Sequence, residues 1–411
     1  MTQPALEVRV YDTLDSLSTL QAAWEQLLSE FSTATTFCTL DWLLPWWRAF
    51  GGGQQIKVIA FFDSTQRLVA IAPLSVTAHR VASGVKLKLL RLMGDGSQDS
   101  DNLDLPVRPG FEDRFAGSLL DFLESERNSW DFVELNTLPP ESPGANALRQ
   151  LLGQKKWVAI EQQIPASAIA LPATWEEYGR LLSAKERGKI GLRTRRLEKK
   201  YEVRIRRCAD EGEIDTLLQT LYELHGKHWQ LRGSPGTLHL PARQQFYGEL
   251  ARLLLPRRRL ELWVLELQGK VVGAQFGLRY GTTVFSLQEG FDPDYAADSV
   301  GYVLRSQVLK QLIADGVRRY DFLGGADESK LRWGAESGHY LNLSFARPLS
   351  AGAVYLQAQD YAGRSKSWLR RHLPRTAWEM LHKINVGVRQ TGSQTDSTKK
   401  DADEETAQDP K

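Results

Sequence analysis

The sequence of 411 residues contains little cysteine: Cys38 and Cys208 are its two cysteines, far apart and without a CxxC pair. A disulfide framework is therefore not expected, and a reducing compartment is favoured. No run of 18 apolar residues occurs, so we expect no transmembrane helix. The first residues, MTQPALEVRV, lack the basic and apolar regions of a signal peptide, which favours the cytoplasm.

Several catalytic motifs are also missing. The sequence has no GxSxG, no P-loop and no GxGxxG, so the hydrolase, nucleoside triphosphatase and dinucleotide-binding classes each lack their motif. His225 and His228 lie three residues apart, but neither an HExxH motif nor a cysteine accompanies them. We therefore predict no metal site, because ligation would need further ligands nearby.

Hydrophobic residues make up 42% and charged residues 25% of the chain, as in globular proteins, and the length suits two domains. The two halves repeat one order of elements: two helices, a hairpin, a strand, a helix and a strand. We therefore predict two similar α/β domains, 1–172 and 173–349, followed by a helical extension, 350–390. The polar residues 391–411 predict a disordered tail.

In the second half, TTVFSLQEG predicts a strand and SVGYVLRSQVLKQLIADG a helix that Ser299 caps and Gly316 ends. Free backbone N–H groups at such a helix start, with the helix dipole, favour a phosphate or pyrophosphate. Gly301 would let a ligand approach the backbone, and Glu289 could act as a general base on an amine. The alternative is a Ser-capped helix after a polar loop; Asp298 supports it by bringing negative charge to the same place.

The stretch YDFLGGADESKLRWG, residues 320–334, places Asp321 at a strand end, two glycines after it, and Lys330 ahead of Trp333. Strand ends beside flexible loops are where α/β folds place groups that contact ligands. Lys330 could hold an anionic group, and Asp321 could orient that lysine or accept a proton. The alternative is a salt-bridged surface loop with Trp333 packed in the core.

Two segments are rich in basic residues. Between Lys185 and Arg207, helical spacing could bring basic residues onto one face that meets nucleic acid, anionic lipid or a sugar nucleotide. A solvated basic helix is the alternative, and the interleaving of aromatic with basic residues that is typical of single-strand binders is absent. Within 350–390, Arg370 and Arg371 lie beside Trp368, which suits a helix on an anionic membrane or one packed on the domain.

The chain resembles the GNAT superfamily, specifically its CelD-like (cellulose-biosynthesis-type) branch, whose relatives include the Fem-type aminoacyltransferases. The resemblance covers roughly residues 6–348 and rests on the following stretches: FCTLDWLLPWWRAF, MGDGSQDSDNLDL, SAKERGKIGLRTRRLEKK, LHGKHWQLRGSPG, and the run from VVGAQFGLRY to KLRWG. It implies tandem GNAT-like domains of α/β class and acyl transfer to an amine or hydroxyl. The usual donor is acetyl-CoA or another acyl-CoA, and related proteins act in polysaccharide and envelope biosynthesis.

The resemblance also implies roles for single residues. Donor binding falls to Ser299, Val300, Gly301 and Tyr302, and catalysis to Glu289, Asp321 and Lys330. To the substrate we assign Arg187, Arg193, Trp229, Gln275 and Gln288. The sequence departs from the usual Arg/Gln-x-x-Gly-x-Gly/Ala turn, where it has AADSVGY.

The expected acceptor is a glycan or envelope precursor, met in the cytoplasm or at the inner face of the membrane through 350–390. No metal and no DNA partner are expected. Two alternatives remain open: a Fem-like transferase that uses aminoacyl-tRNA, and a binding module without catalysis in a polysaccharide synthesis assembly.

Overall fold

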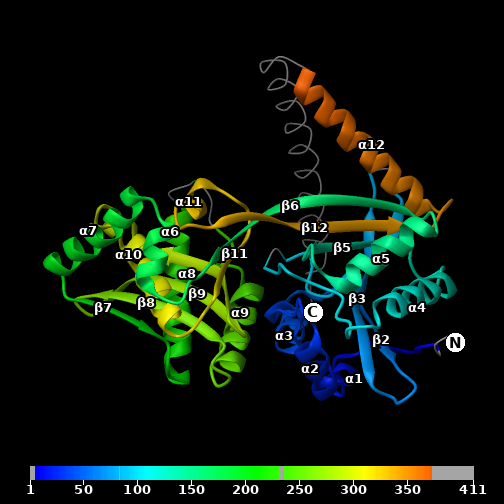
Figure 1. Cartoon of the computed structure of the whole chain (residues 1–411), viewed down its shortest axis with the longest axis horizontal. Helices are drawn as coiled ribbons and strands as arrows, with labels where there is room; N and C mark the ends of the chain where they lie inside the picture. The colour runs from blue at the N-terminus through cyan, green and yellow to red at the C-terminus, as the bar shows by residue number, and fades with distance from the viewer. Residues whose placement is uncertain (1–4, 83, 98, 231–232, 234–235, 373–411) are drawn as a thin grey trace, which may run out of the picture. The chain divides into compact units, whose positions relative to one another are not determined.

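The computed structural model describes residues 5–372 except 83, 98, 231–232 and 234–235, with side chains to residue 365 (Figure 1). Its strands form one twelve-stranded mixed sheet. They are β1 (Glu7–Tyr11), β2 (Gln55–Phe62), β3 (Leu68–Arg80), β4 (Lys86–Leu92), β5 (Phe132–Leu138), β6 (Val158–Ala170), β7 (Val203–Arg207), β8 (Leu260–Leu267), β9 (Lys270–Tyr280), β10 (Thr283–Phe291), β11 (Arg319–Gly324) and β12 (Glu336–Ala346).

Helices cover the sheet and connect its strands. They are α1 (Leu14–Ser18), α2 (Gln21–Glu30), α3 (Leu40–Phe50), α4 (Glu112–Ser125), α5 (Pro143–Gln154), α6 (Trp175–Leu181), α7 (Ala184–Lys200), α8 (Ile214–Gln230), α9 (Pro241–Leu254), α10 (Val300–Ala314), α11 (Glu328–Leu331) and α12 (Ala351–His372). Three short 3₁₀ helices accompany them: η1 (Thr36–Cys38), η2 (Glu211–Glu213) and η3 (Pro293–Asp298).

The two halves of the sheet exchange their last strands. The strand order is β1-β2-β3-β4-β5-β12-β6-β11-β10-β9-β8-β7, so β12 lies against β5 and β6 lies against β11. β6 and β12 pair with each other from Val158 opposite Ala346 to Ala168 opposite Glu336. Figure 1 shows these two strands side by side between the two groups of strands. Each half is therefore completed by a strand from the other half of the sequence.

Two cores lie on the sheet. The larger core joins the first half to α8 and α9; in it Trp42 of α3 meets Phe246 of α9 edge-on, with ring centroids 5.0 Å apart. The smaller core packs α6, α7 and α10 against β8, β9 and β11, and it includes Trp333. Trp333 is 4% exposed, as expected for a core side chain.

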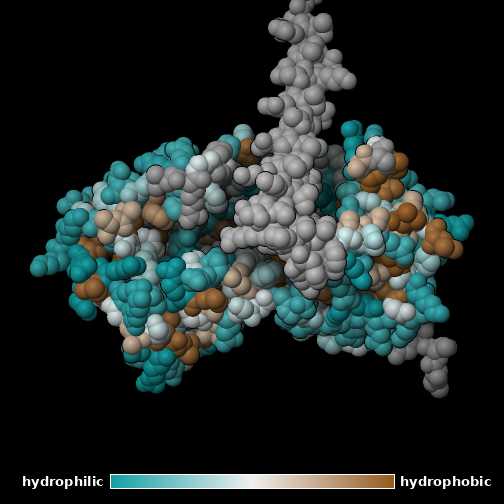
Figure 2. All heavy atoms as spheres, turned by 90° about the horizontal axis from the view of Figure 1, so that it is seen from above, coloured by the Kyte–Doolittle hydropathy of each residue, from teal (hydrophilic) through white to brown (hydrophobic). Residues whose placement is uncertain are grey.

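A boundary between two compact units falls between Ala353 and Val354, within α12. The predicted tail 391–411 and the part of the extension beyond residue 372 lie outside the described residues, and the predicted domain bounds stay predictions. No helix among the described residues is long and apolar enough to cross a membrane. On the face that Figure 2 shows, hydrophilic side chains predominate and apolar ones are scattered.

The predicted fold class is confirmed: the structure is a mixed α/β fold in which one order of elements occurs twice. The hairpin between β8 and β9 turns at Gln268 and Gly269, both with positive φ, as a Gly-containing turn requires. Gly316 follows α10 at φ 78°, the left-handed conformation that ends helices. Ser299 is the N-cap residue of α10, as predicted, but its side chain makes no capping hydrogen bond.

Candidate active site

β10 and β11 pair side by side and then separate. Their parallel pairing runs over Thr283–Phe285 and Arg319–Asp321. Beyond that point β10 stays with β9 as far as Phe291, whereas β11 stays with β6 and reaches Gly324 opposite Ala166. The result is an opening in the sheet between two parallel strands, and ligands in α/β folds bind at such carboxyl ends.

A bulge turns the side chains of β10 at this opening. The register against β9 shifts between Ser286 and Gln288, and such bulges re-aim side chains beside active sites. After the bulge, the Gln288 side chain donates to the Tyr247 hydroxyl on α9, 3.0 Å away. The next side chain, Glu289, pairs with Arg305 on α10. The side chains of Gln288 and Glu289 therefore lie on opposite faces of the sheet, one against α9 and the other against α10.

Helix α10 begins beside the opening with free backbone donors. Ser299 adopts a left-handed conformation (φ 60°), and its carbonyl accepts from the N–H groups of Tyr302 and Val303. The N–H groups of Val300 and Gly301 have no partner among the described residues. Asp298 turns away, because its carboxylate bonds to Lys200 Nζ at 2.9 Å, an interaction that lowers the pKa of Asp298. The carboxylate that argued against an anion site is thus neutralised within the protein.

A cavity of about 340 Å³ lies over this helix start. Its lining includes all four predicted donor-binding residues, together with Arg193 and Glu289. Two further arginines, Arg305 and Arg332, also line it. Three guanidinium groups against one carboxylate give the cavity a formal surplus of positive charge, which suits a ligand that carries phosphates.

Glu289 and Arg305 form the charged centre of this cavity, and Gln275 Nε2 donates to Glu289 Oε2 at 3.2 Å. Burial by itself would raise the pKa of the Glu289 carboxyl, but the charge and hydrogen bond of Arg305 outweigh it and hold that pKa below its usual value. Two buried polar atoms beside this pair have no partner in the described structure: Gln275 Oε1, an acceptor, and Arg305 Nε, a donor. Buried groups of this kind normally find partners, so each of these two atoms lacks the hydrogen bond that its burial calls for.

Asp321 and Lys330 lie on the β11 side of the opening, and the 340 Å³ cavity is lined without them. Asp321 is 2% exposed; burial raises the pKa of its carboxyl even though Arg319 pairs with it at 3.0 Å. Lys330 Nζ donates to the carbonyls of Phe322, Gly324 and Gly325 at 3.1, 2.6 and 3.2 Å. Since an ammonium has three protons, Lys330 is fully used in holding this turn.

The predicted substrate residues separate into two groups. Arg193 lies 4.3 Å over the Tyr302 ring at the cavity, and Gln275 bonds to Glu289. Arg187 donates instead to the Gly179 carbonyl, Gln288 faces α9, and the Trp229 ring lies 5.9 Å from that of His225 on α8. The roles assigned to all these residues stay predictions.

Sequence reasoning missed Arg305, Arg332 and Asp101. Arg305 lies one helical turn beyond Gly301, a spacing that could have indicated a side chain at the same cavity. Asp101 belongs to the first half of the chain and accepts from the Gly324 N–H at 2.8 Å. Burial raises the pKa of the Asp101 carboxyl to about 6 despite that hydrogen bond. The contact between Asp101 and Gly324 joins residues more than 200 positions apart, so no local sequence pattern could predict it.

The first half has a similar parallel pair, β4 and β5, joined over Leu89–Arg91 and Phe132–Glu134. Beyond this pair, Asn136 donates to Asp95 at 2.8 Å; within it, Arg91 donates to Gln54 at 3.3 Å. The first turn of α4 carries Glu112 and Asp113, so negative charge stands where α10 offers free N–H groups. Among the described residues of this half, the start of α4 thus offers no equivalent site for a phosphate.

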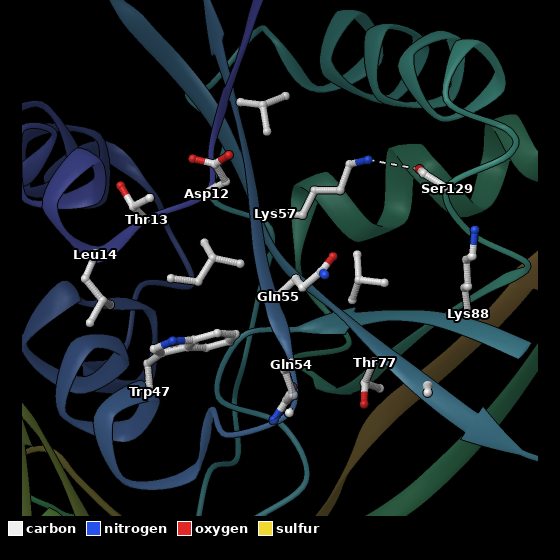
Figure 3. Close-up of a pocket in the computed structure, with 15 residues that line it drawn as sticks. Asp12, Thr13, Leu14, Trp47, Gln54, Gln55, Lys57, Thr77, Lys88 and Ser129 are labelled. Carbon is white, nitrogen blue, oxygen red and sulfur yellow. Dashed lines mark hydrogen bonds between the residues drawn. The ribbon is translucent and has the colours of Figure 1, made fainter. Parts of the chain in front are cut away.

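A larger groove of about 960 Å³ lies on the first half (Figure 3). Asp12, Thr13 and Leu14 line one side of it, and Lys57, Lys88 and Ser129 line the other. Its lysines already have partners: Lys57 Nζ donates to Ser129 Oγ at 2.9 Å, and Lys88 Nζ donates to the Asn128 carbonyl at 2.9 Å. Both lysine amino groups are thus engaged by partners within the protein.

Comparisons with known proteins agree with this geometry. Residues 184–331 match the acetyltransferase (GNAT) domain family. The fold is similar to that of FemX, with a TM-score of 0.58 and 11% identity over 79% of this chain and 96% of that one. It is also similar to a conserved protein of unknown function from Bacteroides thetaiotaomicron, with a TM-score of 0.51 and 13% identity over 83% of this chain and 100% of that one. No curated protein matches the sequence.

Residues 184–331 in the second half of the chain therefore contain a GNAT acetyltransferase domain, which supports an acyltransferase activity. The two similar structures support the whole fold, including both halves, because the match to each covers most of the two chains compared. The CelD-like branch stays a prediction.

Proposed function

We propose that this protein transfers an acetyl or other acyl group from acyl-CoA to an amine or hydroxyl of a glycan or envelope precursor. The observation that carries the donor assignment is the cavity at the start of α10, where free N–H groups of Val300 and Gly301 meet the side chains of Arg193 and Arg332. Phosphates are bound by helix N-termini and arginines together. The proposed acceptor class rests on the resemblance to CelD-like proteins.

The residues present fit such a donor. The N–H groups of Val300 and Gly301 and the cavity arginines would hold its phosphates. Acyl-CoA would supply a thioester carbonyl that a nucleophile can attack. The opening between β10 and β11 would admit that carbonyl, and backbone N–H groups at the bulge could polarise it.

In the transfer, the amine or hydroxyl would form a C–N or C–O bond as the C–S bond breaks, and the CoA thiolate would leave. A carboxylate at the opening would take the proton from the nucleophile. Glu289 and Asp321 are the candidates, and they differ in electrostatics. Arg305 keeps Glu289 ionised but weakens it as a base, whereas burial makes Asp321 the stronger base.

Calorimetric titration with acetyl-CoA and desulfo-CoA tests the proposal. We expect saturable binding of both, because the phosphates rather than the thioester supply the main contacts. Absence of any binding by the purified full-length protein would overturn the proposal and leave the aminoacyl-tRNA donor or a module without catalysis.

One observation favours aminoacyl-tRNA as a second candidate donor. Helix α7 exposes Lys185, Arg195, Arg196 and Lys199, while Arg193 of the same helix lines the cavity. A polyanion on this helix would lie beside the opening. The candidate predicts tRNA binding that weakens steeply with salt, with a log–log slope reduced by about 2 in the double variant Arg195→Gln, Arg196→Gln. A salt slope unchanged by that variant would exclude α7 as the contact.

A further inference from the structure

A loop from the first half of the chain reaches the opening in the second half. This interdomain loop, residues 94–104, is described apart from residue 98. Two tryptophans of α3 anchor it: Trp46 Nε1 donates to Ser97 Oγ at 2.8 Å, and Trp42 Nε1 donates to Ser100 Oγ at 3.0 Å. A buried indole N–H needs such a partner. The tryptophans that cluster in the sequence therefore fix the position of this loop.

The interdomain loop contacts β10 through a chain of hydrogen bonds. Both Asp99 oxygens accept from Arg243 Nε, at 3.1 and 3.0 Å, and the two side chains are only 1% and 9% exposed. The Tyr247 hydroxyl donates to Asp99 at 3.1 Å and accepts from Gln288 at 3.0 Å. Burial raises the pKa of Tyr247 well above its ordinary value, so the hydroxyl keeps its proton and this direction of donation. This series of hydrogen bonds ends at Gln288, the residue that follows the β10 bulge.

The same loop contacts β11 a few residues later. Asp101 accepts from the Gly324 N–H at 2.8 Å, while Lys330 holds the Gly324 carbonyl at 2.6 Å. Asn102 Nδ2 donates to the Tyr340 hydroxyl on β12 at 2.8 Å. One short loop thus holds both strands at the point where they separate, β10 through Tyr247 and β11 through Asp101.

We propose that the interdomain loop positions the two strands for acyl transfer and sets the width of the opening between them. This inference rests on the proposed function, because the opening matters as the place where donor and acceptor meet. Tyr247 and Asp101 are then positioning residues, contributed to one site by both halves of the chain. Their effect should fall on turnover, since misplacement of reacting groups by about 1 Å can cost about 10²-fold in rate.

The contacts of the interdomain loop with β10 and β11 are not needed merely to hold the two halves of the chain together. Trp42 and Phe246 already join the halves through the core, and the Asp99–Arg243 pair joins them again. The hydroxyl of Tyr247 adds a link from that pair to Gln288, and Asp101 adds a link to a backbone N–H at the end of β11. Both links lead to the opening.

The test uses the full-length chain with two substitutions and a matched partner for each. Tyr247→Phe removes one hydroxyl and leaves the Asp99–Arg243 pair intact; its control is Tyr222→Phe, whose hydroxyl faces the Gln244 carbonyl at 3.4 Å instead. Asp101→Ala removes the acceptor of the Gly324 N–H. Its partner Asp101→Asn keeps an oxygen that can accept, so it should restore the wild-type behaviour.

Three quantities are measured. Hydrogen exchange reports the amides of 286–290 and 323–325 without any need for activity. Titration with desulfo-CoA reports donor binding at α10. Turnover is followed with acetyl-CoA as donor and hydroxylamine as the acceptor probe, through release of the CoA thiol.

We expect faster exchange at 286–290 in Tyr247→Phe and at 323–325 in Asp101→Ala. Turnover should fall about tenfold or more in both, while the Kd of desulfo-CoA changes less than about twofold, because only the strand spacing is altered. Normal turnover despite faster exchange would overturn the inference, as would an equal loss in Tyr222→Phe or no rescue by Asp101→Asn. If the wild type neither binds desulfo-CoA nor consumes acetyl-CoA, the proposed function fails. The hydrogen-exchange data then decide separately whether the interdomain loop holds the two strands. Unchanged exchange in both variants would refute that role of the loop.

Discussion

Gly301 allows steric and electrostatic effects on donor binding to be separated. It occupies the first turn of α10, and a Cβ built there would lie 3.0 Å from Phe291 Cδ1, so the ring would have to move by a few tenths of an ångström. Gly301→Ala adds this contact alone. Gly301→Asp adds the same contact and a negative charge at the proposed phosphate position.

The expected cost of the charge follows from Coulomb's law. A carboxylate about 5 Å from a phosphate, at an effective dielectric constant of about 20, repels it by about 3 kcal/mol, and water in the open cavity lowers this toward about 1 kcal/mol. The Kd of desulfo-CoA should therefore rise roughly 5- to 150-fold in Gly301→Asp relative to Gly301→Ala. The fold should tolerate both changes, since alanine favours helices and an acidic residue favours a helix start.

Calorimetric titration of both variants and of the wild type measures this difference. Gly117→Asp is the matched control, because it adds the same charge on α4, where a Cβ would meet nothing within 4 Å. Equal weakening by alanine and aspartate would refute the electrostatic reasoning. Unchanged binding in both variants would show that the donor phosphates lie elsewhere.

Three further predictions concern single side chains. Glu289→Gln should lower turnover about 10²-fold if Glu289 takes the proton. The wild-type rate should then persist to a lower pH than with an ordinary glutamate as base, because Arg305 lowers the pKa of Glu289; a pH–rate profile of both proteins checks this. Lys330→Met should cost about 2–3 kcal/mol of unfolding free energy in denaturant titrations, because three carbonyls lose a charged donor, and it should leave the Kd of desulfo-CoA unchanged. Burial raises the pKa of the Asp104 carboxyl from 3.8 to about 6 in the folded protein. The protonated carboxyl therefore stabilises the folded state at low pH, and this stabilisation is lost as the pH rises through 6. Compared with Asp104→Asn, the wild type should thus lose up to about 3 kcal/mol between pH 4 and 6 in thermal or denaturant unfolding, and a pH-independent difference would contradict the assignment.

Local patterns predicted much of the fold. The strand expected at TTVFSLQEG is observed as Thr283–Phe291, and the helix expected at SVGYVLRSQVLKQLIADG is observed as Val300–Ala314. These elements depend on side-chain periodicity and turn residues within a few positions of one another. The strand exchange could not be predicted in this way, because pairing of β5 with β12 joins Leu138 to Leu341, about 200 positions apart.

In the candidate site, too, local features could be predicted from the sequence and long-range contacts could not. The start of α10 was predicted because the helix pattern and Gly301 are local signals. The pairing of Arg305 with Glu289 depends on how α10 packs on β10, and the approach of Asp101 to Gly324 depends on the exchange of strands. The pairing of Asp298 with Lys200 could not be predicted either, because the two residues lie about 100 positions apart.

The exchange of β6 and β12 has a consequence for synthesis. While the chain emerges from the ribosome, the β5 edge has no neighbour until residues 336–346 have been made, because β12 is the strand that covers it. An uncovered edge can accept a strand from another chain. Two nascent copies held close together could therefore complete each other's first half, so crowded translation of this protein should produce intertwined dimers that dilute translation avoids.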